Sequence, residues 1–369
     1  MDMCILDSGL SAEPGRFVFD KSYLNLKITG TREELIFLRD LSRGIVFSRA
    51  ISGGFLLYGS REEFKIFLEK KYASLDKSFR IKLKVLIELN SDEIKLPNSG
   101  SLSFVKPLIM GVINVTNDSF YINSQTPNLK MAMTKVKQML SEGADIIDIG
   151  GESSRPGSKP VEPDIEISRI IPLIKGIREF SKVPISIDTY RKDTAEKAIE
   201  AGADIINDIS ALTFDNQMAV YAALNDVPVI LMHMKGKPAT MQSDPFYSNV
   251  IEALYEFFTG RIKFAEKMGM NIKNLILDPG IGFGKRLEDN LTILKNIEIF
   301  KKFRLPLMLG TSRKSFIGEV LNQKNPNERL NGTMGTTALG VLKGVHIFRV
   351  HDVRENREIA DLVYNIIDI

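Results

Sequence analysis

The chain contains one cysteine, Cys4, among 369 residues, so no disulfide can form within it. Such a composition is typical of proteins of the reducing cytoplasm, and we expect a cytoplasmic location. The first residues include acidic side chains and no basic segment ahead of an apolar stretch, which argues against a secretory signal. No apolar run approaches the ~20 residues that a membrane-spanning helix needs, so no membrane association is expected.

The chain also has no large excess of positive or negative charge. The chain has 49 lysine and arginine residues against 46 aspartate and glutamate residues, a net charge of +3. A balance this close indicates neither a nucleic-acid partner nor an anionic membrane surface. The three histidines include no pair at zinc-ligand spacing, so a zinc site is not expected. A Gly-x-Ser-x-Gly nucleophile turn and a P-loop are absent as well.

Eight short apolar runs are present, and each is followed by a polar, Gly- or Pro-rich cluster and then by a helical pattern. Runs rich in valine, isoleucine and leucine are typical of strands that are buried on both faces. Eight such strands, each with a crossover helix, predict a parallel (β/α)8 barrel, or TIM barrel, whose active site lies at the carboxyl ends of the strands. The runs begin at Leu108, Asp145, Pro184, Ile205, Pro228, Leu275, Pro306 and His346.

A smaller domain precedes the barrel. We expect residues 1–104 to hold this domain and its linker, and residues 105–369 to hold the catalytic barrel. Alternating and helical patterns predict the order strand, helix, strand, strand, helix, strand, a small α+β domain of the ferredoxin-like type. The expected strands are 22–29, 45–50, 55–58 and 79–89, with helices from Thr31 and Ser60.

The segment 91–103 is polar and contains Pro97, Asn98 and Gly100. We interpret it as a linker with few buried contacts. No group of side chains before it suggests any chemistry. The amino-terminal domain is therefore interpreted as a packing or oligomerisation module.

Polar side chains end three of the buried strands, at Asp188, Asn207 and Asp278. Burying an unpaired polar group is costly, so each of these side chains needs a partner. One alternative is that Asp188 only caps the helix that follows it. Three hydrogen-bonding side chains in one concave, apolar setting instead favour a flat heterocycle with several N–H and C=O groups at its edge.

Basic side chains end the seventh and eighth strands, where this fold often binds phosphate. They are Arg313, Lys314, Arg349 and His351. Arginine binds phosphate bidentately, and lysine acts as a point charge.

Two loops are unusual in composition. The turn 280–284 is only superficially similar to a dinucleotide fingerprint, because the final glycine spacing and the following acidic residue are missing. We interpret it as a loop that lets backbone approach a ligand and lets Phe283 stack on a ring. The segment 152–157 is long, polar and bounded by glycine and proline, as mobile functional loops often are.

Together these clusters resemble the dihydropteroate synthase family. The resemblance covers residues 107–369 and all eight strand ends in order. A looser resemblance links residues 1–104 to an extension that some of these synthases carry. The matching clusters are Asn114-Val115-Thr116, Gly151-Glu152-Ser153-Ser154-Arg155-Pro156-Gly157, Asp188-Thr189, Asn207-Asp208, Met232-His233-Met234, Asp278-Pro279-Gly280-Ile281-Gly282-Phe283-Gly284-Lys285, Ser312-Arg313-Lys314-Ser315 and Arg349-Val350-His351-Asp352.

The resemblance implies a transferase of folate biosynthesis. It would join 6-hydroxymethyl-7,8-dihydropterin diphosphate to 4-aminobenzoate and release diphosphate, with Mg²⁺ as cofactor and sulfonamides as competitors. We also expect a homodimer. By position, the pterin would be bound by Asp188, Asn207, Asp278 and Lys314; the diphosphate by Asn114, Arg349 and His351, with Asn114 also near the metal; and the aminobenzoate by Ser154, Arg155, Pro156, Phe283 and Ser315. The catalytic residues implied are Lys314, Asp188, Arg349 and His351.

The residue chemistry agrees with that reaction. A carboxylate at Asp278 can accept two pterin N–H bonds. The C–O bond to diphosphate can break first and leave a cation delocalised into the pterin ring. An arylamine is already a neutral nucleophile, so catalysis depends on positioning and charge stabilisation more than on a general base.

The first loop departs from the family pattern. Asn117 stands where proline is usual, and residues 121–124 replace a Ser-Asp-Gly-Gly segment. Ser154 replaces the more usual threonine. Two alternatives stay open at this point: a methyltetrahydrofolate–corrinoid methyltransferase-like barrel, which should lack the Ser-Arg-Lys-Ser and Glu-Ser-Ser-Arg-Pro-Gly loops, and a non-catalytic pterin-binding protein.

Overall fold

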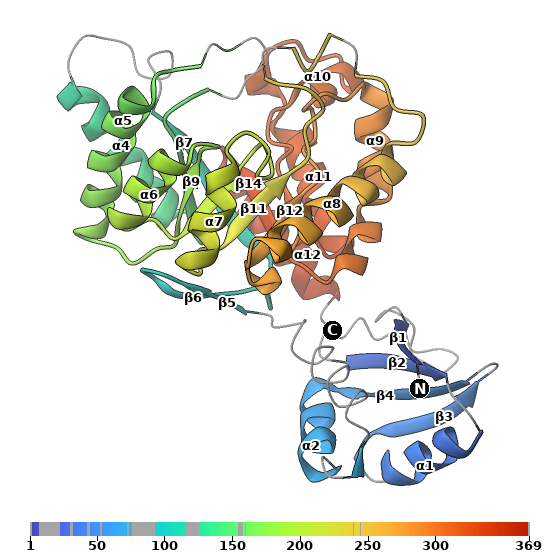
Figure 1. Ribbon diagram of the computed structural model, residues 1–369. Coiled ribbons are helices and arrows are strands. Elements are labelled where there is room, and N and C mark those ends of the chain that lie inside the picture. The colour runs from blue at the N-terminus through green and yellow to red at the C-terminus, as the bar shows by residue number, and fades with distance from the viewer. Residues whose placement is uncertain are drawn as a thin grey trace. The chain divides into compact units, whose positions relative to one another are not determined.

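The chain forms two compact units, Met1–Ser91 with Ile366–Ile369, and Asp92–Asn365. None of the helices in the described parts of the chain is long and apolar enough to cross a membrane. The computed structural model (Figure 1) describes residues 2–6, 23–29, 32–42, 45–51, 54–71, 74–75, 93–115, 125–153, 158, 160–238, 240–243 and 245–367.

The larger unit contains a barrel of eight parallel strands, as predicted (Figure 1). The strands pair in the order β12-β11-β10-β9-β8-β7-β14-β13, and a parallel bridge between Leu277 and Leu307 joins the two ends. Every strand begins within two residues of its expected position. The strands are β7 (Leu108–Asn114), β8 (Ile146–Gly150), β9 (Ile185–Asp188), β10 (Ile205–Asp208), β11 (Val229–Met232), β12 (Leu275–Asp278), β13 (Met308–Leu309) and β14 (Ile347–Val350).

Helices alternate with these strands and surround them (Figure 1). Helix α8 shows why they form: Asn249 caps its amino end, and buried Val250, Leu254, Phe258 and Ala265 share one face. The helices are α4 (Gln125–Ser141), α5 (Pro163–Arg178), α6 (Lys192–Glu200), α7 (Asn216–Leu224), α8 (Val250–Lys267), α9 (Leu287–Lys295), α10 (Ser315–Val320), α11 (Leu330–Leu342) and α12 (Val353–Ile367), with 3-10 turns at Ile272–Asn274, Ile297–Phe303 and Pro326–Glu328.

A hairpin closes the amino-terminal end of the barrel. Strands β5 (Glu93–Leu96) and β6 (Gly100–Ser103) pair antiparallel. Their side chains Ile94, Leu96 and Leu102, with Phe104, are buried in one cluster with the first interior residues of the barrel strands. The interpretation of residues 91–103 as a linker is therefore wrong. The prediction failed because two four-residue strands show little periodicity around a turn rich in proline, asparagine and glycine.

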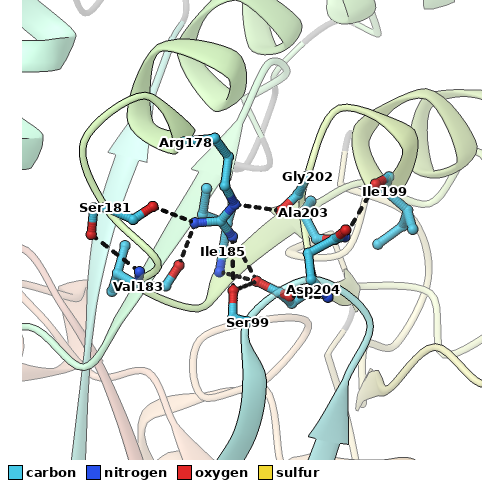
Figure 2. A network of polar contacts seen from close by, with 10 residues as sticks. Ser99, Arg178, Ser181, Val183, Ile185, Ile199, Gly202, Ala203 and Asp204 are labelled. Carbon is cyan, nitrogen blue, oxygen red and sulfur yellow. Dashed lines mark hydrogen bonds and ion pairs between the residues drawn. The ribbon is translucent and has the colours of Figure 1, made fainter.

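The turn of this hairpin is tied to the barrel by Asp204, which is fully buried (Figure 2). Its carboxylate accepts from the backbone N–H of Asn98 at 3.0 Å, from Ser99 Oγ at 2.7 Å and from the N–H of Ile185 at 2.9 Å. Arg178 donates to it as well, at 2.8 Å. The barrel unit thus begins near Asp92, ahead of the expected boundary at residue 105.

The smaller unit holds a four-stranded antiparallel sheet in the order β1-β2-β4-β3. Strand β4 lies between the two strands that α1 connects, which is the expected split-βαβ arrangement. Strand β1 was not anticipated, and the expected strand 79–89 lies outside the described residues. The elements are β1 (Asp2–Leu6), β2 (Tyr23–Thr29), α1 (Arg32–Ser42), β3 (Phe47–Ile51), β4 (Gly54–Ser60) and α2 (Arg61–Lys71), around a core that includes Ile28, Leu38, Leu57, Phe64 and Phe67.

Candidate active site

Four isoleucines form a layer of the barrel interior. Ile146, Ile205, Ile276 and Ile347 lie on β8, β10, β12 and β14, and all four are fully buried in the cluster that the hairpin covers. An interior layer built from four side chains of alternate strands is typical of this fold. The layer forms the apolar floor beneath the carboxyl ends of the strands.

The next inward-facing position of each of these strands is polar. Side chains alternate between the two faces of a strand, so the residue two places further on points into the same interior. That residue is Asp148, Asn207, Asp278 or Arg349, and we call these four residues the polar layer. Three of them were predicted, but Asp148 was missed. The signal that could have found it is the shared offset of two residues after an isoleucine.

Arg349 connects carboxylates from two other strands. Its Nε donates to Oδ2 of Asp148 at 2.7 Å, and its Nη2 lies 2.6 Å from the same oxygen. Nη2 also donates to Oδ2 of Asp188 at 2.9 Å. The amide Nδ2 of Asn207 donates to both oxygens of Asp148, at 3.3 and 3.4 Å. Asp148, which is fully buried, is therefore the acceptor shared by Arg349 and Asn207.

The charges in this group are strongly coupled. Burial raises the pKa of the Asp188 carboxyl to about 7; Arg349 opposes this shift and Asp148 adds to it. Burial disfavours the charge of Arg349, but Asp148 and Asp188 raise its pKa above the ordinary value. Asp188 therefore changes its charge near neutral pH, beside a guanidinium that stays charged.

Asp188 does not cap the helix that follows it. Helix α6 begins after Arg191, and the Asp188 carboxylate pairs with Arg349 instead. The capping alternative is therefore wrong, and Asp188 faces the mouth of the barrel.

Lys314 lies close enough to Asp278, the third acid of the site, for their charges to interact. Its Nζ donates to the carbonyl of Ile281 and lies 4.6 Å from the centre of the Phe283 ring. Burial lowers the Lys314 pKa to about 8, while the charge of Asp278 opposes that shift. Asp278 accepts from the N–H of Gly280 at 2.8 Å, and burial raises its pKa, although Lys314 acts against the rise. A cation, a carboxylate and an aromatic face thus converge.

The loop that carries Phe283 is held by a buried lysine. Nζ of Lys285 donates to the carbonyls of Gly280, Phe283 and His233 at 2.8, 3.1 and 3.2 Å, and it lies 2.9 Å from Nδ1 of His233. Burial lowers the pKa of Lys285 and of His233 well below their usual ranges. Gly280 has φ +63°, and a Cβ there would lie 2.0 Å from the carbonyl oxygen of His233, so only glycine fits.

The end of β14 and the start of α10 place the other basic residues. His351 Nδ1 lies 3.0 Å from Oγ of Ser312, a contact that was not predicted. Arg313 forms a two-point ion pair with Asp352, at 2.6 and 2.8 Å, which makes it part of the scaffold. Ser315 is exposed as the first residue of α10.

Asn114 is the last residue of β7, and its side chain lies beside Gly150, which has no Cβ to crowd it. A Cβ on Gly150 would lie 3.0 Å from Oδ1 of Asn114 and 3.6 Å from Cβ of Asp188. The carboxamide oxygen is thus close to the strand end that carries Asp188. In the described parts of the chain no three His, Cys, Asp or Glu side chains come together as a metal site.

Three of the predicted residues, Ser154, Arg155 and Pro156, lie outside the described residues, as does most of the first loop. Before this segment, Glu152 accepts from the hydroxyl of Tyr190 and from the N–H of Val161, at 2.8 and 2.9 Å. It also pairs with Arg191 at 2.8 Å. Sequence reasoning did not identify these contacts of Glu152 with Tyr190, Val161 and Arg191.

Comparison with known proteins gives a consistent result. A family model described as "Pterin binding enzyme" matches residues 110–351. Dihydropteroate synthase of Synechocystis sp. is 43% identical over 252 residues, which cover 68% of this chain and 87% of that protein.

Two solved structures extend the similarity to the fold. One is Yersinia pestis dihydropteroate synthase in a complex with a sulfonamide drug, with a TM-score of 0.68 and 37% identity over 72% of this chain and 96% of that one. The other is Xanthomonas albilineans dihydropteroate synthase with 4-aminobenzoic acid, with a TM-score of 0.71 and 33% identity over 76% and 99%.

Proposed function

The chain belongs to the dihydropteroate synthases, and from this premise we propose how its own residues divide the work. The reaction joins 6-hydroxymethyl-7,8-dihydropterin diphosphate to 4-aminobenzoate and releases diphosphate. The observation that carries the proposal is the polar layer: four converging polar side chains above an apolar floor. The corrinoid methyltransferase alternative is set aside, because the relatives named above are synthases.

We assign the pterin edge to Asn207, Asp278, Asp188 and Lys314. Asp278 is buried, and Gly280 satisfies one of its oxygens, so its remaining acceptor capacity is available to pterin N–H groups. Lys314 supplies a cation on the same side as Asp278. Acceptors and one donor above an apolar floor suit a heterocycle with both kinds of group at its edge.

We assign the diphosphate to Arg349, His351 and Asn114 at the ends of β14 and β7. Arg349 stays charged because two carboxylates surround it. Its Nε and Nη2 are engaged by those carboxylates, so Nη1 is the nitrogen we assign to an anion. Fixed positive charge at the leaving group lowers the barrier to departure, since it requires no reorganisation during the reaction.

The bond changes follow from these positions. The C–O bond between the pterin methylene and the diphosphate breaks, and its electron pair leaves with the diphosphate. The arylamine nitrogen then forms the new C–N bond and loses one proton to diphosphate or water. No general base is needed, because the amine is neutral before attack.

Magnesium fits the donor set as an ion carried by the substrate. Mg²⁺ prefers oxygen ligands and usually takes most of them from phosphate and water. Oδ1 of Asn114, which would lie 3.0 Å from a Cβ on residue 150, is one such oxygen. When bound, the ion would neutralise charge on the departing diphosphate.

For 4-aminobenzoate we propose a pocket formed by Phe283 and Ser315, with Ser154, Arg155 and Pro156 from the loop after β8. Phe283 is half-buried beside Lys314 and offers a ring face. The homodimer and the cytoplasmic location stay predictions, and size-exclusion chromatography with light scattering tests the first.

The proposed assignment is tested by substituting one residue of each group. Asn207→Ala should weaken binding of 6-hydroxymethylpterin and leave binding of inorganic diphosphate unchanged. His351→Ala should do the reverse. Calorimetry that shows both ligands weakened equally by each folded variant would contradict the division.

A further inference from the structure

A buried carboxylate at the centre of the polar layer has no place in the functions assigned above. Asp148 is fully buried, so it cannot touch a substrate that enters from solvent. It nevertheless accepts from two residues that are assigned to different substrate groups, Arg349 and Asn207. Its contacts cross the barrel interior, because β7 separates β8 from β14 and β9 separates β8 from β10.

The contact with Asn207 fixes the direction of a carboxamide. An asparagine side chain has a donor end and an acceptor end, and the two are interchangeable in shape. Asp148 has only acceptors when ionised, so it holds the Nδ2 end at 3.3 and 3.4 Å. The Oδ1 end is then directed away from Asp148.

We propose that Asp148 is a positioning residue for pterin recognition: by holding the amide end of Asn207, it makes Asn207 present an acceptor, as Asp278 does, to the heterocycle. The same carboxylate keeps Nε of Arg349 engaged and so fixes the plane of the guanidinium. The ligand class selected is a heterocycle whose edge carries several N–H donors. This inference rests on the pterin role assigned to Asn207.

Replacing Asp148 by asparagine removes the group that fixes the orientation of the Asn207 carboxamide. In the variant Asp148→Asn, the new side chain has one acceptor and one amide group between two donors, Arg349 and Asn207. If its oxygen accepts from Arg349, its own amide faces Asn207, and the Asn207 carboxamide turns. The donor end of Asn207 then meets the donors of the pterin edge. Asp148→Asn is therefore expected to weaken 6-hydroxymethylpterin binding at least about tenfold, as for a lost buried hydrogen bond.

An exchange of the two side chains should reverse the effect. In the double variant Asp148→Asn with Asn207→Asp, the oxygen of residue 148 accepts from Arg349 and its amide donates to the carboxylate at 207. The second oxygen of that carboxylate is again an acceptor for the pterin. We expect the double variant to bind 6-hydroxymethylpterin within about threefold of wild type, because the same hydrogen bonds are restored.

Asp204 provides a matched control. It is equally buried and is also paired with an arginine, Arg178 at 2.8 Å, but it lies at the hairpin end of the barrel (Figure 2). Asp204→Asn should lower the melting temperature and leave pterin affinity and the KM for both substrates unchanged. A purely structural carboxylate at 148 would behave in the same way.

The experiment is calorimetry of 6-hydroxymethylpterin with the full-length wild type and three variants: Asp148→Asn, the exchange and Asp204→Asn. It is paired with steady-state kinetics. The proposal expects Asp148→Asn to raise the KM for the pterin substrate, to leave the KM for 4-aminobenzoate unchanged, and to be rescued by the exchange. A folded Asp148→Asn protein with wild-type affinity overturns it. A folded exchange variant whose affinity for 6-hydroxymethylpterin stays at least about tenfold below that of the wild type also overturns it.

If Asp148→Asn does not fold, the exchange variant alone decides the question, because every buried group in it has a partner. Failure of the underlying function is distinguishable. In that case the wild-type protein itself would not bind 6-hydroxymethylpterin.

Discussion

Nη2 of Arg349 lies 2.9 Å from Oδ2 of Asp188, although 161 residues separate them in the chain. The same nitrogen lies 2.6 Å from Asp148, so one guanidinium serves two buried carboxylates. A single positive charge cannot fully compensate two negative ones in a buried setting. The carboxyl of Asp188 is consequently the group that holds a proton up to about pH 7.

This arrangement predicts a pH dependence of stability. The pKa of the Asp188 carboxyl in the folded protein, about 7, exceeds the ordinary aspartate value of about 3.9. The folded protein therefore binds this proton more tightly than the unfolded chain does. The stability that results is fully present below the unfolded pKa and is lost as pH rises through about 7. Asp188→Asn removes the titration and keeps the shape.

Urea unfolding of wild type and Asp188→Asn at several pH values between about 5 and 8 measures this contribution. The free energy of unfolding of the wild type, relative to the variant, should fall by a few kcal/mol across that window. A difference that stays constant over the range would contradict the coupling of Asp188 with its neighbours.

Lys314 should be required for turnover and not for folding. Lys314→Met removes the cation beside Asp278 but keeps a long apolar stem against Phe283. We expect kcat to fall on the order of 10²-fold, as for the loss of a preorganised electrostatic contact. Near-normal kcat in a folded Lys314→Met variant would exclude a role for Lys314 in catalysis.

The lowered pKa of Lys314 adds a second test. Burial brings it to about 8, so its charge, and with it kcat/KM, should decline as pH rises above that value. Lys314→Arg keeps a charge at all accessible pH values, because arginine does not titrate there. In that variant the alkaline decline should move up or vanish, whatever its absolute rate. If the alkaline decline of kcat/KM is unchanged in Lys314→Arg, the decline reports the titration of another group.

Asp278→Asn should weaken pterin binding with little effect on shape. The substitution places an amide among groups that are expected to donate, and an unpaired buried polar group costs about 1–3 kcal/mol. We expect the Kd of 6-hydroxymethylpterin to rise roughly 5- to 150-fold, the same energy expressed as a ratio. Binding of inorganic diphosphate serves as the internal control. A Kd equal to that of the wild type would exclude Asp278 from the pterin edge.

The hairpin at the barrel's amino-terminal end sets where the chain can be shortened. A chain of residues 92–369 keeps Ile94, Leu96, Leu102 and Phe104, and it should fold and keep most of its turnover. A chain of residues 105–369 loses all four buried side chains. At about 1.5–3 kcal/mol each, the loss is roughly 6 kcal/mol or more, comparable with the whole stability of many domains.

Circular dichroism melts and turnover of the two shortened chains check this prediction. Equal melting temperatures would show that the hairpin does not stabilise the barrel. A folded 92–369 chain without turnover would show instead that the amino-terminal unit contributes to catalysis. Its interpretation as a packing module would then be wrong.

The barrel could be predicted from the sequence because its signal repeats. Each strand is an apolar run that ends in a polar cluster, and errors in one run do not affect the next. The hairpin at Glu93–Ser103 has no such repetition. Two buried residues in one strand and one in the other are too few to distinguish a hairpin from a linker, so only its packing against the barrel identifies it.

The candidate site shows the same division. Asn207, Asp278 and Arg349 stand out because a polar side chain interrupts an apolar strand near its end. Asp148 lies within the run Ile146–Gly150, two residues before the cluster, and its partners are far away in sequence. The contact of Lys285 with His233 was also missed. A buried lysine is recognised only from the backbone carbonyls around it, which the sequence does not show.

Diphosphate release by the purified full-length protein tests directly whether it is a synthase. Release is followed with Mg²⁺, the pterin diphosphate and 4-aminobenzoate supplied together or one at a time. We expect stoichiometric release of diphosphate and formation of 7,8-dihydropteroate only when both substrates are present, with loss of product when a sulfonamide competes. A folded wild-type protein that binds 6-hydroxymethylpterin but releases no diphosphate with both substrates present would contradict it.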